Sequence, residues 1–115
     1  MSIKKSEIYL ANLDPTIGAE ISKKRPVLIV SNDINNEYAS TVTILPITSK
    51  TDRIFPFEIE LQAGEGNLKE SSKIKANQIR TIDKSRLQQK IGSISDKKMN
   101  DVEKAILIHL DIKPV

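Results

Sequence analysis

The sequence predicts a mainly β protein: a small, strongly bent antiparallel sheet or barrel with one C-terminal α-helix. Short stretches rich in β-branched residues, alternating or continuous in their apolar residues, recur between turn-forming residues over most of the chain. One segment near the C-terminus instead repeats its apolar residues at helical spacing. The chain has 115 residues, of which 38% are hydrophobic, so we expect one domain over residues 1–115 with its own core.

The first two predicted strands are separated by a long connection. Glu7–Asn12 contains β-forming side chains, and Asp14-Pro15 ends the strand. Four consecutive aliphatic residues, Val27–Val30, predict a buried strand, and Pro26 suits its first position because proline donates no backbone hydrogen bond. The connection Leu13–Lys24 is longer than a hairpin requires, so we expect a mobile flap.

Further strands are predicted after a polar connector at Asn35–Tyr38. Thr41–Ile47 alternates polar and apolar residues before it becomes fully apolar, as a strand that enters the core does. Phe57–Leu61 alternates strictly, which predicts a strand with one solvent-facing side. Ser72–Ala76 and Gln78–Ile82 place basic residues opposite isoleucines, so these two short strands are expected to carry a basic surface.

The C-terminal part is expected to be partly helical. Asp83 is suited to cap one helical turn, and Gln88–Ile91 has the pattern of a last short strand. Ser95 is suited to cap a helix that runs from Asp96 to about Leu110. The apolar residues that share one face of this helix are Met99, Val102, Ile106 and Leu110.

Composition excludes several kinds of site. The chain has no cysteine, which excludes disulfides and thiolate metal ligands, and one histidine, His109, is too little for a nitrogen-ligand site. We therefore expect neither a metal nor a cofactor. The apolar runs are too short to span a membrane, and charged residues stand where a signal peptide needs an apolar core. The prediction is a cytoplasmic protein with no membrane partner.

The net charge of +3 comes from one segment of the chain. Residues 69–90 contain seven basic and two acidic side chains. Lys73, Lys75 and Arg80 lie on the predicted strands of this segment and are candidate contacts to a nucleic acid. The alternative is a solvated lysine-rich face with no specific partner.

Arg25 and Thr48 each stand at the margin of a predicted strand. Pro26 favours an extended conformation for Arg25, which places its guanidinium at the mouth of the buried strand. Five donors in a rigid fork suit phosphate recognition, although a surface ion pair is an equally good interpretation of Arg25 alone. Thr48 follows the third strand, where a hydroxyl serves either a site or simple turn capping.

Several blocks of the chain resemble the MazF/PemK family of toxin endoribonucleases. They are Ile8-Tyr9, Leu13, Pro15, Gly18-Ala19-Glu20, Arg25–Val30, Asn32-Asp33, Ile47-Thr48 and Asn77–Lys84. The resemblance implies an SH3-like barrel and a homodimer. It also implies sequence-specific, metal-independent cleavage of single-stranded RNA, usually messenger RNA, under control of a cognate antitoxin, for which we expect an acidic, flexible tail.

The same resemblance assigns candidate residues. The family's catalytic arginine and threonine fall on Arg25 and Thr48. Its RNA-contacting positions fall on Asn32 and Gln78, with weaker matches at Ile17 and Glu20 in the flap. The chain departs from the family pattern at Lys5-Ser6-Glu7 and Ser22-Lys23-Lys24, and neither departure removes a catalytic group.

Two other functions remain open from the sequence. One is a gyrase-targeting toxin like those of the CcdB family, which the absence of a C-terminal tryptophan disfavours. The other is a catalytically silent barrel that only binds nucleic acid or a partner protein. Retention of both Arg25 and Thr48 disfavours this second alternative.

Overall fold

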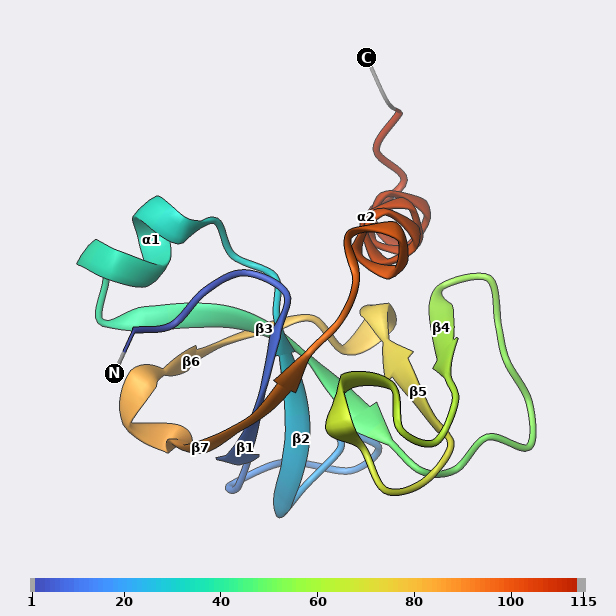
Figure 1. Cartoon of the computed structure of the whole chain (residues 1–115), viewed down its shortest axis with the longest axis horizontal. Coiled ribbons are helices and arrows are strands. Elements are labelled where there is room, and N and C mark those ends of the chain that lie inside the picture. The colour runs from blue at the N-terminus through green and yellow to red at the C-terminus, as the bar shows by residue number, and fades with distance from the viewer. Residues whose placement is uncertain (1, 114–115) are drawn as a thin grey trace.

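The strands form an antiparallel sheet that bends around its longest member. A computed structural model describes residues 2–113 (Figure 1). The strands are β1 (Glu7–Asn12), β2 (Lys24–Ile29), β3 (Thr41–Thr48), β4 (Glu58–Leu61), β5 (Ser72–Lys75), β6 (Arg80–Asp83) and β7 (Leu87–Ser93). The helices are α1 (Asp33–Tyr38) and α2 (Asp96–Leu110). The sheet order is β4-β5-β3-β2-β1-β7, with β6 paired to β3.

β3 is the centre of this sheet because it pairs with three other strands. One of its edges pairs with β2, while the other pairs with β6 over residues 41–44 and with β5 at Ile47 and Thr48. Pro46 lies between these two partners and has no backbone N–H to offer a further strand. The sheet therefore divides and bends at this point.

The predicted fold class is confirmed in its bent-sheet form. The ends of the sheet do not meet: β6 pairs with β3, β7 pairs with β1, and a short 3₁₀ turn, Lys84–Arg86, connects β6 to β7. The turn begins as predicted, since the Asp83 carboxylate accepts a hydrogen bond from the Ser85 amide at 2.8 Å. The sheet is thus open rather than a closed barrel.

Alternation along the strands divides the buried residues between the two faces of the sheet. Ile8, Leu28 and Leu45 point to the face that α2 covers, and Met99, Val102 and Ala105 of α2 complete this core. Tyr9, Val27, Ile29, Val42 and Ile44 point to the opposite face and form a second core. Burial on both faces explains why the inner half of β2, Val27–Ile29, is entirely apolar.

α2 has the predicted bounds and the predicted cap. The Ser95 hydroxyl accepts a hydrogen bond from the Lys98 amide at 3.2 Å, and α2 packs against β4 and the Ala76–Gln78 turn. The prediction for Leu110 is wrong, because its side chain remains 46% exposed. All three residues of this last turn, 108–110, are exposed, so helical spacing alone overstates the buried face. Figure 1 shows α2 on one side of the sheet.

Three other boundaries differ from the sequence prediction. The connector at Asn35–Tyr38 belongs to the short helix α1. Asn32 caps this helix, because its side-chain oxygen Oδ1 accepts a hydrogen bond from the Asn35 amide at 2.8 Å. β6 begins at Arg80 because Ala76–Gln78 is a 3₁₀ turn, and β7 is longer than Gln88–Ile91. Within residues 2–113, no helix is long and apolar enough to cross a membrane.

Candidate active site

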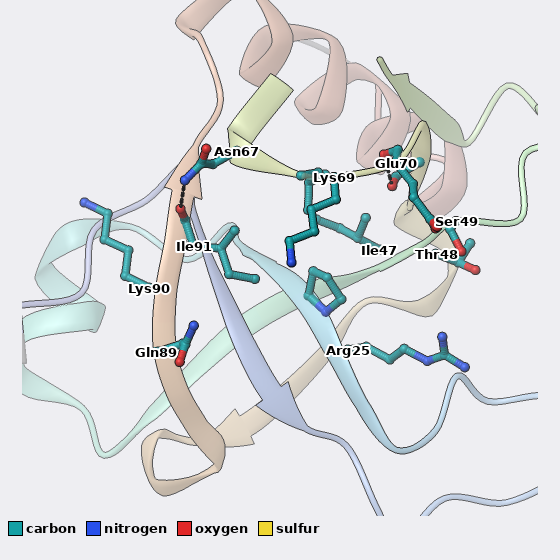
Figure 2. Close-up of a pocket in the computed structure, with 13 residues that line it drawn as sticks. Arg25, Ile47, Thr48, Ser49, Asn67, Lys69, Glu70, Gln89, Lys90 and Ile91 are labelled. Atoms are coloured by element: carbon teal, nitrogen blue, oxygen red, sulfur yellow. Dashed lines mark hydrogen bonds between the residues drawn. The ribbon is translucent and has the colours of Figure 1, made fainter. Parts of the chain in front are cut away.

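A surface pocket of about 570 Å³ opens between β2, the end of β3, the chain before β5, and β7. Arg25 and Thr48 both line it, together with an apolar floor that includes Pro26, Ile47 and Ile91. Figure 2 shows Arg25 and Thr48 at one end of this pocket, with Gln89 and Lys90 at the other. We call it the Arg25 pocket.

The register of β2 and β3 explains why Arg25 and Thr48 meet. Val27 pairs with Pro46 and Ile29 with Ile44 in this antiparallel ladder. The same register, continued two residues beyond the last paired residues, sets Arg25 opposite Thr48. Side chains at opposite positions of an antiparallel pair share a face of the sheet. The pocket lining contains both strand margins, a proximity that the sequence alone did not establish.

Arg25 is half-buried and held by its own chain. Its Nε–H donates to the carbonyl oxygen of Ser22 at 3.2 Å, which leaves the terminal N–H groups for a ligand. Within the part of the chain that the structure describes, no carboxylate pairs with Arg25. The interpretation of Arg25 as a surface ion pair is therefore wrong, and its guanidinium remains available to an anion.

Thr48 is the last residue of β3. Its Oγ1 accepts a hydrogen bond from the Lys50 amide at 3.3 Å, so the hydroxyl proton remains free to be donated. A donor hydroxyl beside a guanidinium is an arrangement that stabilises negative charge on phosphate oxygens.

Two lysines line the pocket, and they differ in whether a carboxylate pairs with them. Lys69 is exposed, and Figure 2 shows its side chain above the middle of the pocket. Lys90 is paired with Glu7, whose Oε2 lies 2.6 Å from Nζ. Burial opposes ionisation of Glu7, but hydrogen bonds from Lys90, the Lys4 amide and the Tyr9 hydroxyl outweigh it and lower the pKa of this carboxyl. Lys69 is thus the more available cation.

Lys73 and Lys75 do not form the predicted open basic surface. Both ammonium groups lie 3.2 Å from the carboxylate of Glu58 on β4, and Lys73 is only 6% exposed. Neither residue lines the Arg25 pocket. Alternation along β5 correctly placed both side chains on one face, but the chain that follows Thr48 folds over this face and brings Glu58 to it.

Gln78, Arg80, Glu20 and Ile17 meet at the flap rather than in the Arg25 pocket. Gln78 accepts from the Ile21 amide at 2.8 Å and donates to the Ala19 carbonyl oxygen at 3.3 Å, while Arg80 donates to the carbonyl oxygen of Leu13 at 3.2 Å. Glu20 accepts from the Ile17 amide at 2.7 Å. Glu20, Gln78 and Arg80 line a second hollow of about 290 Å³, and the Ile17 side chain is exposed.

Asn32 lies apart from both hollows. It follows the end of β2 that is opposite to Arg25, and its side chain caps α1. Neither hollow has Asn32 in its lining. Its role in RNA contact therefore stays a prediction from the family resemblance.

The sequence did not indicate one wall of the Arg25 pocket. Asn67 ends a short 3₁₀ turn, Glu65–Asn67, and Lys69 follows this turn, which packs directly on β7 at Gly92. A Cβ at Gly92 would lie 2.4 Å from the carbonyl oxygen of Gly66, so only glycine permits this approach. An isolated glycine in a strand was the available signal, but it does not say which segment approaches.

The acidic side chains and the histidine do not form a cation site. Between residues 2 and 113, no three or more of them gather where they could hold a metal ion. Arg25 and Thr48 bring hydrogen-bond donors to the Arg25 pocket, and Glu70 is the acidic residue in its lining.

The family model described as PemK-like, MazF-like toxin of type II toxin–antitoxin system matches residues 4–110. The chain belongs to this family. It is 38% identical to the endoribonuclease MazF of Staphylococcus saprophyticus over 98% of this chain and 95% of that protein. The expectation of a toxin endoribonuclease is thereby confirmed, and a gyrase-targeting toxin or a silent barrel is not favoured.

Solved structures of this toxin family have the same fold. MazF from Deinococcus radiodurans superposes with a TM-score of 0.84 at 23% identity, covering 96% of this chain and 98% of that one. The Mycobacterium tuberculosis toxin MazF-mt6 superposes with a TM-score of 0.80 at 27% identity, covering 94% of this chain and 99% of that one. A mycobacterial endoribonuclease in complex with its cognate antitoxin superposes with a TM-score of 0.81 at 22% identity, covering 98% of this chain and 99% of that one.

Proposed function

We propose that this toxin cleaves single-stranded RNA, and messenger RNA in particular, by attack of the RNA's own 2′-hydroxyl, with Arg25 and Thr48 as the catalytic residues. The observation that carries the proposal is that the two donor side chains line one pocket and that, among the described residues, no carboxylate forms an ion pair with Arg25. Because messenger RNA is translated in the cytoplasm, the substrate also implies that location.

The reaction needs a group that aligns the phosphate and stabilises its charge. The 2′-oxygen forms a bond to phosphorus, the bond from phosphorus to the 5′-oxygen breaks, and a 2′,3′-cyclic phosphate and a 5′-hydroxyl result. The proton of the 2′-hydroxyl leaves, and the departing 5′-oxygen gains one. The Arg25 terminal N–H groups and the Thr48 hydroxyl bind the phosphate oxygens as charge accumulates on them.

Arg25 acts in this scheme through its charge rather than as a general base. An arginine guanidinium keeps its proton up to a pH of about 12 or higher, so it removes a proton poorly near neutrality. Its Nε–H already donates to Ser22, which fixes the plane of the fork before substrate arrives. A preorganised cation of this kind needs no rearrangement during the reaction.

RNA is expected to enter along the Arg25 pocket and under the flap. Lys69 supplies a free cation there, and the apolar floor at Pro26 and Ile91 offers a surface for a base. Ile17 in the flap has an exposed side chain, and we expect it to contact the RNA. The same channel would accept the acidic tail of a cognate antitoxin. A mycobacterial endoribonuclease with this fold is known in complex with its cognate antitoxin.

Cleavage of a long defined RNA by the pure protein, with EDTA present, tests the proposal. We expect cuts at a limited set of sequences, each with a 2′,3′-cyclic phosphate or its opened 3′-phosphate and a 5′-hydroxyl. A single 2′-deoxy substitution at a cut site should abolish cleavage while binding persists. Cleavage of the deoxy substrate, 5′-phosphate ends, or loss of activity in EDTA would show instead that water is the nucleophile.

A further inference from the structure

The loop that follows Thr48 is anchored from beneath by a buried ion pair. This 49–57 loop leaves the site at Ser49 and returns to the sheet at β4. Lys73 and Glu58 lie below it with side-chain exposures of 8% and 0%. Buried charges are costly unless they are paired and hydrogen-bonded. A buried ion pair next to the proposed catalytic residue Thr48 therefore raises the question of which segment it stabilises.

Lys73 contacts the loop directly. Its Nζ donates to the carbonyl oxygen of Arg53 at 2.7 Å and to Oε1 of Glu58 at 3.2 Å. The same Glu58 oxygen accepts from the Phe55 amide at 2.9 Å, and the Glu58 amide donates to the Phe55 carbonyl oxygen at 2.9 Å. One ammonium group therefore joins β5, β4 and the backbone of the loop.

Thr48 is connected to Lys73 in two ways, through strand pairing and through the 49–57 loop. Lys73 is its antiparallel partner on β5, so the backbone of the two residues is paired. The 49–57 loop begins at the next residue, and Arg53, the residue that Lys73 holds, lies five positions beyond Thr48. The side chain of Arg53 stacks 4.5 Å from the ring centre of Phe55, which packs on Phe57. These contacts order the second half of the loop, and Lys73 attaches it to the sheet.

Lys75 provides a contrast within the same cluster. Its Nζ lies 3.2 Å from Oε2 of Glu58, an ion pair whose geometry falls short of a hydrogen bond. In the described chain it makes no hydrogen bond to the loop. Both lysines therefore neutralise Glu58, but only Lys73 connects the charge cluster to the segment that begins at Thr48.

We propose that Lys73 is a positioning residue for RNA cleavage: it fixes the 49–57 loop to β5 and thereby holds the Thr48 hydroxyl in the Arg25 pocket. This inference rests on the proposed function, in which Thr48 donates to the phosphate. A displacement of about 1 Å at a catalytic group costs on the order of 100-fold in rate, so a loosened loop should reduce turnover without removing any substrate contact.

Two matched substitutions test the proposal. Lys73→Met removes the ammonium group and keeps most of the aliphatic side chain, and Lys75→Met does the same at the other lysine. We expect Lys73→Met to lower kcat by roughly 10- to 100-fold with KM for RNA little changed. Lys75→Met, which loses an ion pair to the same carboxylate, should keep kcat within about twofold.

A third variant separates positioning from stability. Lys73→Met leaves Glu58 with less compensation, so this variant is expected to unfold more readily. In Lys73→Met/Glu58→Gln the neutral amide still accepts from the Phe55 amide, and thermal stability should return toward that of the wild type. The low kcat should remain, because the bond to Arg53 is still absent. Recovery of kcat together with stability would overturn the proposal.

Hydrogen exchange reports on the loop without any RNA. The Phe55 amide should exchange roughly tenfold faster in Lys73→Met/Glu58→Gln than in the wild type, and at an unchanged rate in Lys75→Met. Unchanged exchange in the first variant would show that Lys73 does not hold the loop. If the wild-type protein failed to cleave RNA, the proposed function would fall, whereas this exchange comparison would still decide whether Lys73 attaches the loop.

Discussion

Arg25 and Thr48 contribute different chemistry to one pocket, and single substitutions should separate their contributions. Arg25→Ala should lower the cleavage rate by about two to three orders of magnitude or more, since loss of one preorganised donor costs about 2.7–4 kcal/mol and Arg25 also carries charge. Arg25→Lys should restore little, because an ammonium group lacks the fork geometry. Single-turnover cleavage of a defined RNA measures both effects.

Thr48→Ala should also be severe, whereas Thr48→Ser should stay partly active because it keeps the hydroxyl. Circular dichroism and unfolding curves provide the control, since both residues lie at a strand margin and their loss should leave the fold intact. Full activity of Thr48→Ala would contradict the assigned role.

Tyr9 should make stability depend on pH in the alkaline range. Burial, the nearby charge of Glu7 and the hydrogen bond to its carboxylate raise the pKa of Tyr9 from 10.0 to about 12. The folded state thus favours the neutral phenol. Its contribution, of about 2–3 kcal/mol, is fully present below pH 10 and is lost as the pH rises through about 12.

Two substitutions isolate this effect. In Tyr38→Phe, Tyr9 is the remaining tyrosine, and its ultraviolet titration should have a midpoint near pH 12. The Tyr9→Phe variant should lack the corresponding part of the alkaline loss in the free energy of unfolding, as measured by denaturant titration. Equal alkaline slopes for this variant and the wild type would argue against the assignment.

At the scale of elements, the flap is held at several points by side chains from the second half of the chain. Gln78 makes two hydrogen bonds to it, and Arg80 and Arg86 donate to carbonyl oxygens at its base. Gln78→Ala should release the centre of the flap, because two hydrogen bonds contribute about 1–3 kcal/mol together. Limited trypsin digestion at Lys23 and Lys24 should then accelerate roughly fivefold or more.

A glutamine outside the flap serves as the control for this experiment. Gln89 is exposed on β7, so Gln89→Ala should leave the tryptic rate unchanged. Equal rates for Gln78→Ala and the wild type would mean that Gln78 does not restrain the flap, and its interpretation as an RNA contact would gain support.

At the scale of the whole molecule, the open sheet and several exposed apolar side chains favour self-association. Among residues 2–113, the exposed large apolar side chains are those of Ile17, Ile34, Tyr38, Ile54, Ile108, Leu110 and Ile112. We therefore expect a homodimer of the 12.9 kDa chain, in which a second copy covers part of this surface. Light scattering at micromolar concentration measures the mass, and a monomeric value would contradict the prediction.

Binding of an acidic antitoxin segment should depend on salt. The free cations of the Arg25 pocket attract a flexible acidic peptide that becomes ordered when it binds. Affinity should fall as ionic strength rises, and Lys69→Ala should both weaken binding and reduce the salt dependence. Lys104→Ala, an exposed lysine on α2, is the matched control. Tight binding that neither salt nor Lys69→Ala alters would exclude this mode of inhibition.

The sequence by itself determined the features that depend on neighbouring residues. Alternation and apolar runs located the strands, Ser95 and Asp83 marked helical starts, and Arg25 and Thr48 were placed at strand margins. These signals are readable because a cap or a strand pattern involves residues within a few positions of one another.

Only the tertiary structure decided what each polar side chain contacts. Lys73 is buried because its ammonium group pairs with Glu58, 15 residues away in the sequence. Gln78 holds the flap because it accepts from the amide of Ile21, 57 residues away. Asn32 caps a helix that its polar neighbours did not reveal. Such contacts depend on strand register and on which loop covers which face, and a one-residue change in register would exchange the two faces of a strand.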